Sequence, residues 1–378
     1  MWEAIQANRR RSRLLIALMA AVLVGLGGLI GAAMSGGAEG ALVGVTGALV
    51  VWLVLLILAL SSGEQMVLAG AGARPVQKAD APRLWNVVEE MSIAAGLGTL
   101  PKIHVIDDER PNAFAVGRRP ETASVAVTSG LIKRLGRDEL QGVMAHEIGH
   151  IRNLDTRFMT IALVMVGSIA LLSDMFLRLL WYGGGRRRGG KGGGQAQLVL
   201  LLVTVAAAIL APIAANLLYL ACSRRREYLA DASAARFTRY PEGLASALEK
   251  IAGAAQRMKG PRVFRAMAPL YIINPLAPSA TGSLMSTHPP TARRVSILRE
   301  MAGTAGWVDY EKAHRKVTGK SCLDRQTLGS EGSVAARAPL PEAEPREEAV
   351  GRVREVSDLL DRLVDVLVVA CVCGVRIK

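Results

Sequence analysis

Aromatic residues are scarce in this sequence of 378 residues. Only 4% of the residues are aromatic, although 51% are hydrophobic and the mean hydropathy is +0.29. The net charge of +14 would suit a nucleic-acid partner, but no recognition motif with interleaved aromatic residues accompanies the charge. We therefore expect no nucleic-acid partner and assign the positive charge to contact with anionic lipid.

Cysteine and histidine are scarce as well. The four cysteines form neither a Cys-x-x-Cys pattern nor a cluster that could hold structural zinc. If the part of the chain outside the membrane lies in the cytoplasm, as argued below, the cysteines stay reduced. They are Cys222, Cys322, Cys371 and Cys373. The five histidines are His104, His146, His150, His288 and His314; we expect His104 to be structural and His314 to be exposed.

Long uncharged runs, by contrast, are present near the N-terminus. Leu14–Met34 has 21 residues and Ala41–Ser62 has 22, and each meets the length of about 20 residues that a membrane-spanning helix needs. The first run is too long for a signal peptide, and a second follows after a short turn. We expect residues 1–62 to form an uncleaved membrane hairpin.

The basic residues predict the orientation of this hairpin. Four arginines precede the first run, whereas the turn Ser35–Gly40 has one Glu and no basic residue. Because basic residues favour the cytoplasmic side, both ends of the hairpin should be cytoplasmic. The body from Gly63 onward should lie there too.

The segment His146–His150 reads His-Glu-Ile-Gly-His. On a helix, positions four apart share one face, so His146 and His150 can bind one Zn²⁺ together. Glu147 lies about 100° further round at ~3.6 residues per turn, where it can reach a metal-bound water. This is the layout of a zinc peptidase.

Catalytic zinc has three protein ligands and one open position, so a third ligand is required. The best candidate is Glu227, within the segment Ser223–Asp231. Asp231 follows four residues later on the same helical face, where it could accept the second ring N–H of a ligating histidine. Asp155, five residues after His150, could orient a ligand, cap the helix or pair with Arg157.

These segments together resemble the HtpX-type membrane zinc metalloproteases, relatives of the CAAX prenyl proteases. The resemblance extends from the first apolar run to about Met301. Its matching segments are Asn112–Ala115, Thr128–Leu131, Ala145–His150 with Asn153 and Asp155, Ser223–Asp231, Asn274–Leu276, and Ser286–Pro290 with Arg294.

The resemblance implies a role for several residues. His146, His150 and Glu227 would be the ligands of one Zn²⁺ per chain, and Glu147 would be the general base. Asn112 would lie near the substrate cleft. His288 and Arg294 would lie close to the metal, where His288 could donate to the oxyanion and Arg294 could contact substrate.

Two further apolar stretches separate His150 from Glu227, over residues 158–222. Phe158–Tyr182 contains Asp174 and Arg178, whose spacing of four lets them pair. Leu198–Cys222 is uncharged. Because both ligands must lie on one side, these stretches cross the membrane twice or not at all. Their length favours two crossings, whereas the basic, Gly-rich loop between them favours a surface-lying hairpin.

The body, residues 63–157 and 223–318, reads as mixed α and β. Lys102–Ile106, Ala113–Val116 and Ser124–Thr128 are β-prone runs between turn signals. We expect a mainly helical α+β integral membrane protein with a zincin-like catalytic body and a small sheet. The strand near Asn112 is a candidate for pairing with substrate.

The tail, residues 319–378, departs from the family. Ala335–Val350 has the composition of a disordered linker, and Val353–Ala370 carries an apolar stripe at heptad spacing. The tail could dock on the body, lie on the membrane or self-associate, and we assign it no function.

The sequence therefore predicts a multi-pass zinc endopeptidase of the cell inner membrane with a cytoplasmic catalytic body. The family role implies misfolded membrane proteins as substrates in a stress response. Two alternatives are a protease that processes lipidated C-terminal peptides and a membrane zinc-binding scaffold without turnover.

Overall fold

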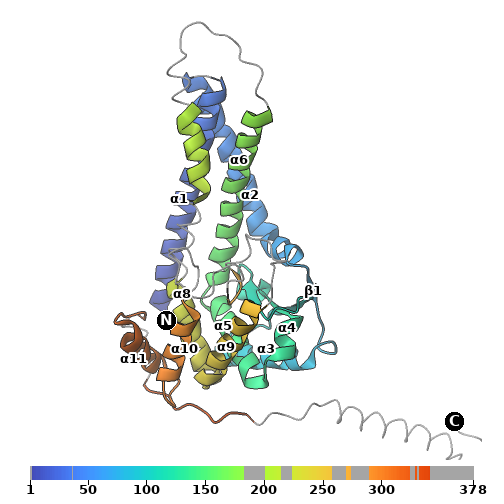
Figure 1. Cartoon of the computed structure of the whole chain (residues 1–378), viewed down its shortest axis with the longest axis vertical. Coiled ribbons are helices and arrows are strands. Elements are labelled where there is room, and N and C mark those ends of the chain that lie inside the picture. The colour runs from blue at the N-terminus through green and yellow to red at the C-terminus, as the bar shows by residue number, and fades with distance from the viewer. Residues whose placement is uncertain are drawn as a thin grey trace, which may run out of the picture. The chain divides into compact units, whose positions relative to one another are not determined.

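The N-terminal residues form a pair of long helices, α1 (Trp2–Ser35) and α2 (Gly37–Gly70), in the computed structural model (Figure 1). Within them, Ile16–Met34 and Gly37–Leu58 are long and apolar enough to cross a membrane, by length and composition. The turn is shorter than predicted because α2 already begins at Gly37, with Glu39 in its first turn. An acid there favours the helix N-terminus.

The structure describes residues 2–35, 37–182, 201–213, 224–257, 270–273, 289–323, 328–329 and 332–340. The chain divides into two units, Met1–Ala338 and Pro339–Lys378. The fold described below is that of the first unit.

Glycines bring α1 and α2 into backbone contact. A Cβ built on Gly31 would lie 2.1 Å from the carbonyl oxygen of Gly40, and one on Gly44 would lie 2.1 Å from that of Gly27. Only a residue without a side chain fits at such a distance. Small residues spaced in this way let membrane helices pack closely, and this packing holds the hairpin together.

A third long helix, α6 (Asp155–Tyr182), runs beside α1 and α2 (Figure 1). Its Asp174 and Arg178 form the expected ion pair, with 2.7 Å between Oδ2 and Nε. A helical segment, Leu201–Ile213, joins the bundle where the hydroxyl of Thr204 donates to the carbonyl of Leu29 at 3.3 Å. Whether residues 158–222 cross a membrane twice stays a prediction.

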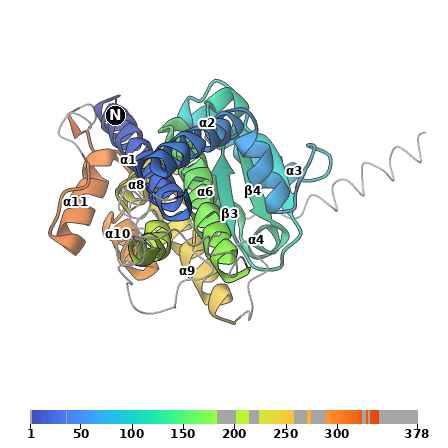
Figure 2. The same ribbon diagram turned by 90° about the horizontal axis from the view of Figure 1, so that it is seen from above.

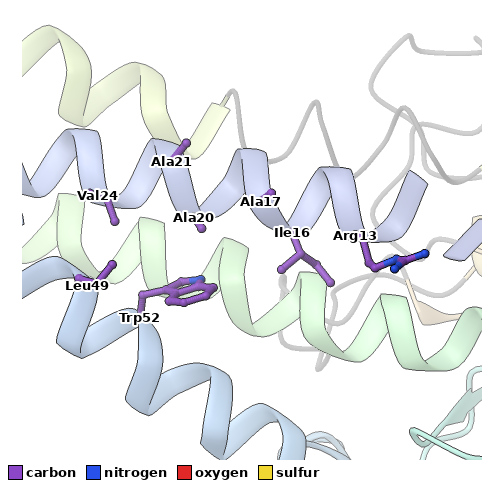
Figure 3. A pocket seen from close by; sticks show the side chains of 8 residues that line it. All are labelled: Arg13, Ile16, Ala17, Ala20, Ala21, Val24, Leu49 and Trp52. Atoms are coloured by element: carbon purple, nitrogen blue, oxygen red, sulfur yellow. The ribbon is translucent and has the colours of Figure 1, made fainter. Parts of the chain in front are cut away.

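A groove of about 470 Å³ lies along α1. Figure 3 shows Val24 and Ala20 of α1 facing Leu49 and Trp52 of α2, with Ile16 and then Arg13 further along α1. The lining is almost wholly apolar, and its one charged member is that arginine. Such a surface suits lipid chains with an anionic headgroup at the cationic end.

The sheet has four strands in the order β1-β2-β4-β3. The predicted strands β2 (Lys102–Ile106), β3 (Ala113–Val116) and β4 (Ser124–Thr128) are confirmed, and the short β1 (Ala73–Pro75) was not predicted. β2 and β4 are parallel, whereas β1 pairs antiparallel with β2 and β3 with β4.

Both faces of the sheet are buried. Val125 and Val127 belong to the core shared with the body helices, while Phe114 and Ala126 belong to a second core shared with α1, α2 and α6. This follows from the two-residue period of a strand. Figure 2 shows α6 beside β3, in agreement with their contacts.

The body helices surround α5 (Arg137–Arg152), which packs against α3 (Pro82–Ala95), α8 (Arg224–Thr238) and α9 (Pro241–Arg257). Glu139 accepts the N–H of Gly136 at 2.7 Å and so caps α5. The remaining helices are α4 (Ser129–Arg134), α10 (Thr291–Glu300), α11 (Trp307–Thr318) and the 3₁₀ turn η1 (Pro120–Thr122).

The first residues of the predicted linker contact the body, and the linker itself stays a prediction. Ala335 pairs with Thr304 as an isolated bridge, and Arg337 donates to the carboxylate of Asp138 at 2.7 Å while stacking on Tyr240. These contacts hold the chain on the body through Ala338. The expected heptad stripe lies outside the described residues.

We predict that Gly44→Ala destabilises the hairpin by about 1–3 kcal/mol, because the new methyl group overpacks against the α1 backbone. Gly47→Ala is the matched control on the same helix, since a Cβ there meets no atom within 4 Å. The measurement is unfolding of the two variants in detergent. Equal stability of both would contradict the close packing.

Candidate metal centre

Helix α5 holds His146 and His150 on one face. Their Nε2 atoms lie 3.2 Å apart and the rings meet edge to face, 4.8 Å between centroids. Both side chains are buried. Two nitrogens bound to one zinc ion at ~2.05 Å with tetrahedral angles would be about 3.3 Å apart. The pair therefore already has the separation of two ligands on a single ion.

Helix α8 supplies Glu227 to the same point. One carboxylate oxygen lies 3.6 Å from Nε2 of His146 and the other 3.6 Å from Nε2 of His150. The close approach of α5 and α8 occurs at Gly149, where a Cβ would lie 3.0 Å from Cβ of Ser233. The three ligand atoms lie within 4.8 Å of one another and could hold a metal ion.

The outer ring nitrogens fix which atoms face this point. Nδ1 of His146 lies 3.0 Å from Oδ1 of Asp231, and Nδ1 of His150 lies 3.1 Å from Oδ2 of Asp155. A carboxylate only accepts, so each Nδ1 carries the proton and each Nε2 presents a lone pair. Two lone pairs and a carboxylate converge, and a metal cation fits that donor set.

Arg294 holds Asp231 in place. Its Nε and Nη2 donate to the two carboxylate oxygens at 2.9 and 2.7 Å, and its Nη1 donates to the carbonyl of Ile272 at 3.0 Å. Burial raises the pKa of Asp231, but the Arg294 charge and the His146 hydrogen bond lower the pKa by more than burial raises it, so the net shift is downward. Asp231 is therefore an ionised acceptor.

The acceptors around His146 also attract protons. Burial lowers its pKa, but hydrogen bonds with Asp231 and Glu227 outweigh burial and raise the pKa to about 9. A surplus of negative charge produces this shift. The same surplus would stabilise a divalent cation in place of the proton.

Glu147 is buried beside His146, and Arg294 is fully buried near the cluster, with Nη1 3.9 Å from Glu227. The guanidinium is engaged with Asp231 and Ile272, which makes it a positioning group for the ligands. Contact between Arg294 and substrate stays a prediction. His288 lies outside the described residues, so its proposed role also stays a prediction.

Asn112 lies at the start of the edge strand β3 and pairs with its own chain. Its Nδ2 donates to the carbonyl of Ile273 at 2.9 Å, and the N–H of Ile272 donates to the carbonyl of Ala113 at 3.0 Å. Residues 272–273 thus extend along part of the edge that was expected to pair with substrate. Binding of substrate by Asn112 stays a prediction.

Sequence reasoning missed a second buried cluster, Glu311, His314 and Cys322. His314 was expected to be exposed, but it is 3% exposed. The error arose because the lysines and arginines around His314 suggested a solvated helix. The spacing Glu311-x-x-His314, which places both residues on one helical face, was the available signal.

Two imidazoles and a carboxylate on neighbouring buried helices, with a further glutamate beside the first imidazole, define a metallopeptidase. The sequence pattern of peptidase family M48 matches residues 78–302. This match covers more than half of the chain. The chain belongs to peptidase family M48 and is a metalloendopeptidase.

Curated relatives cover most of the chain. A protease HtpX homolog of Dictyoglomus turgidum is 43% identical over 82% of this chain and 98% of its own length. The corresponding Dictyoglomus thermophilum protein is 45% identical over the same shares. Crystalline S. mikatae Ste24p is similar with a TM-score of 0.42 and 18% identity, over 66% of this chain and 57% of that chain. Membership of a peptidase family decides against the non-catalytic scaffold.

We predict that Asp231→Ala weakens metal affinity roughly 10–100-fold, as loss of a partner behind a ligating histidine does. The measurement is metal retention against a graded chelator. Asp80→Ala is the control, because Asp80 is exposed and bonds only a neighbouring backbone N–H. Unchanged retention in Asp231→Ala would remove Asp231 from the site.

Proposed function

We propose that this metalloendopeptidase is a membrane-embedded zinc enzyme that cleaves protein substrates on the cytoplasmic side. The observation that carries the zinc assignment is the convergence of His146, His150 and Glu227 described above. Two imidazoles and one carboxylate are a common ligand set of catalytic zinc, and they leave a position open for water.

A zinc ion held by these residues would lower the pKa of its water to about 7 and polarise the scissile carbonyl. Glu147 would accept a proton from the attacking water as the water oxygen bonds to the carbonyl carbon. The same carboxyl gives that proton to the leaving nitrogen as the C–N bond breaks. Asp231 and Asp155 keep both imidazoles in the ligating tautomer throughout.

Membrane embedding is supported by the two apolar helices and their glycine-mediated packing. The cytoplasmic side is supported by the arginines before α1 and their absence from the turn after it. Misfolded membrane proteins are the substrates that the family resemblance implies. A buried metal cluster close to the membrane helices is suited to unfolded chains, because a folded domain could not deliver its backbone there.

We predict that zinc content separates the base from the ligand. Glu147→Gln removes the proton acceptor and no ligand, so zinc should stay bound while peptide hydrolysis is lost. Glu227→Gln removes the only carboxylate ligand of this site and should lose the zinc ion held there and all activity.

The measurement is zinc per chain, together with casein cleavage, after purification without added metal. Both variants replace a carboxylate by an amide of equal size, so each is the control for the other. Zinc retained by Glu227→Gln at the wild-type level would show that the third ligand is misassigned. Cleavage by Glu147→Gln would refute the mechanism.

We predict that a reporter placed before Arg9 or after Lys320 is cytoplasmic and that one between Ser35 and Gly40 is external. The asymmetry of arginines across the hairpin is the reason. Accessibility of single tagged sites in intact cells is the measurement. An external reporter after Lys320 would reverse the proposed orientation.

A further inference from the structure

Three groups that commonly bind metal meet where α11 ends. Glu311 and His314 lie one turn apart on α11, and Cys322 follows in the turn after it. They are 4%, 3% and 6% exposed. A carboxylate oxygen, a ring nitrogen and the sulfur all lie within 4.8 Å of one another. We propose that these residues form a second binding site for a thiophilic divalent ion such as Zn²⁺.

The sulfur and the carboxylate already have a suitable separation. Sγ of Cys322 lies 3.3 Å from Oε2 of Glu311. A thiolate at ~2.3 Å and a carboxylate oxygen at ~2.0 Å from one zinc ion would be about 3.5 Å apart in a tetrahedral site. Thiolate, imidazole and carboxylate together favour zinc over magnesium or calcium, which prefer oxygen ligands alone.

His314 provides the independent observation. Its Nδ1 lies 2.9 Å from the carbonyl oxygen of Lys320, so Nδ1 carries the proton and Nε2 carries the lone pair. Nε2 is buried and has no hydrogen-bond partner among the residues that the structure describes. A buried lone pair without a donor is costly, and an imidazole whose other N–H is held by a carbonyl is the usual form of a metal ligand.

The protonation states suit a metal site that fills by losing one proton. Burial lowers the pKa of His314, which keeps it neutral. Burial raises the pKa of Glu311, but hydrogen bonds from Ser321, Leu323 and Cys322 outweigh it and lower the pKa overall. Burial and the Glu311 charge raise the pKa of the Cys322 thiol.

A cysteine binds a metal ion as its thiolate, so the thiol proton passes to water when the ion binds. Thiolate and carboxylate then balance a dication. Arg315 donates to the other carboxylate oxygen, Oε1, at 3.2 Å, and Oε2 beside the sulfur also accepts the N–H groups of Cys322 and Leu323 at 3.0 Å. Arg225 donates to the backbone carbonyl of Cys322 at 3.0 Å.

The second site would also support the catalytic one. The ring of Tyr228, next to Glu227 on α8, packs edge to face on the His314 ring at 4.5 Å between centroids. Burial and the charge of Asp231 raise the pKa of Tyr310, which is fully buried on α11. An ion between Glu311, His314 and Cys322 would fix α11 against the helix that carries Glu227.

Zinc stoichiometry of the full chain in detergent tests the proposal. Wild type should bind two zinc ions, Cys322→Ser and His314→Gln should each bind one, and Glu227→Gln should also bind one. Cys371→Ser is the matched control and should keep two. If wild type and Cys322→Ser each bind one ion, the second site is refuted. If wild type binds one ion and Cys322→Ser binds none, the second site stands and the catalytic zinc is refuted.

Cobalt reports the second site alone. The ligands proposed for the catalytic ion include no sulfur, so only a cysteine-containing site gives thiolate-to-cobalt charge-transfer absorption. We expect this absorption in cobalt-loaded wild type and in Glu227→Gln and Cys371→Ser, and its loss in Cys322→Ser. If Cys322→Ser does not fold, His314→Gln is the alternative variant, because it keeps the thiol. The cobalt affinity of its cysteine-containing site, followed by the same absorption, should be at least 10-fold lower than in wild type. Cobalt-loaded wild type without the absorption would overturn the proposal.

Discussion

The convergence of His146, His150 and Glu227 is the constraint on which the rest of the structure depends. Three electron-rich groups are brought within 4.8 Å of one another in a buried space, where their mutual repulsion is poorly screened. Such a cluster persists only if a cation occupies it or if its surroundings force it. Asp231, held by Arg294 of α10, and Asp155 at the start of α6 hold the two histidine rings in place through hydrogen bonds to their Nδ1 atoms.

The same constraint shapes the path of the chain. Asp155 begins α6, so the residue that orients His150 is also the first residue of the helix that packs on α1 and α2. The chain must return from that bundle before Glu227 can reach the histidines. Sheet strands β3 and β4 bury one face against the body and the other against the bundle. The metal centre and the long helices are therefore parts of one packed unit, which couples the site directly to the proposed membrane region.

How much the sequence could predict depended on the range of the interaction. The three strands follow local periodicity, and their bounds were predicted correctly. The shared face of the two α5 histidines also follows from local spacing. Arg294 was placed near the metal by resemblance, but its pairing with Asp231, 63 residues away, is a tertiary contact that no local pattern encodes. The burial of His314 was missed for a different reason: the basic residues around it suggested a solvated helix, although its spacing from Glu311 was a local signal. Gly44 lay unnoticed within an apolar run because its role depends on a partner backbone.

Charge balance links the centre to its mechanism. Asp231 and Arg294 form an ion pair, and the carboxylates of Glu227 and Asp155 lie beside the two imidazoles. A dication at the convergence point would neutralise these two charges. Glu147, the proposed base, is not among the three residues that could hold the ion. A group in that position can accept a proton without weakening the ligand set, and this separates the work of the base from the work of holding the metal.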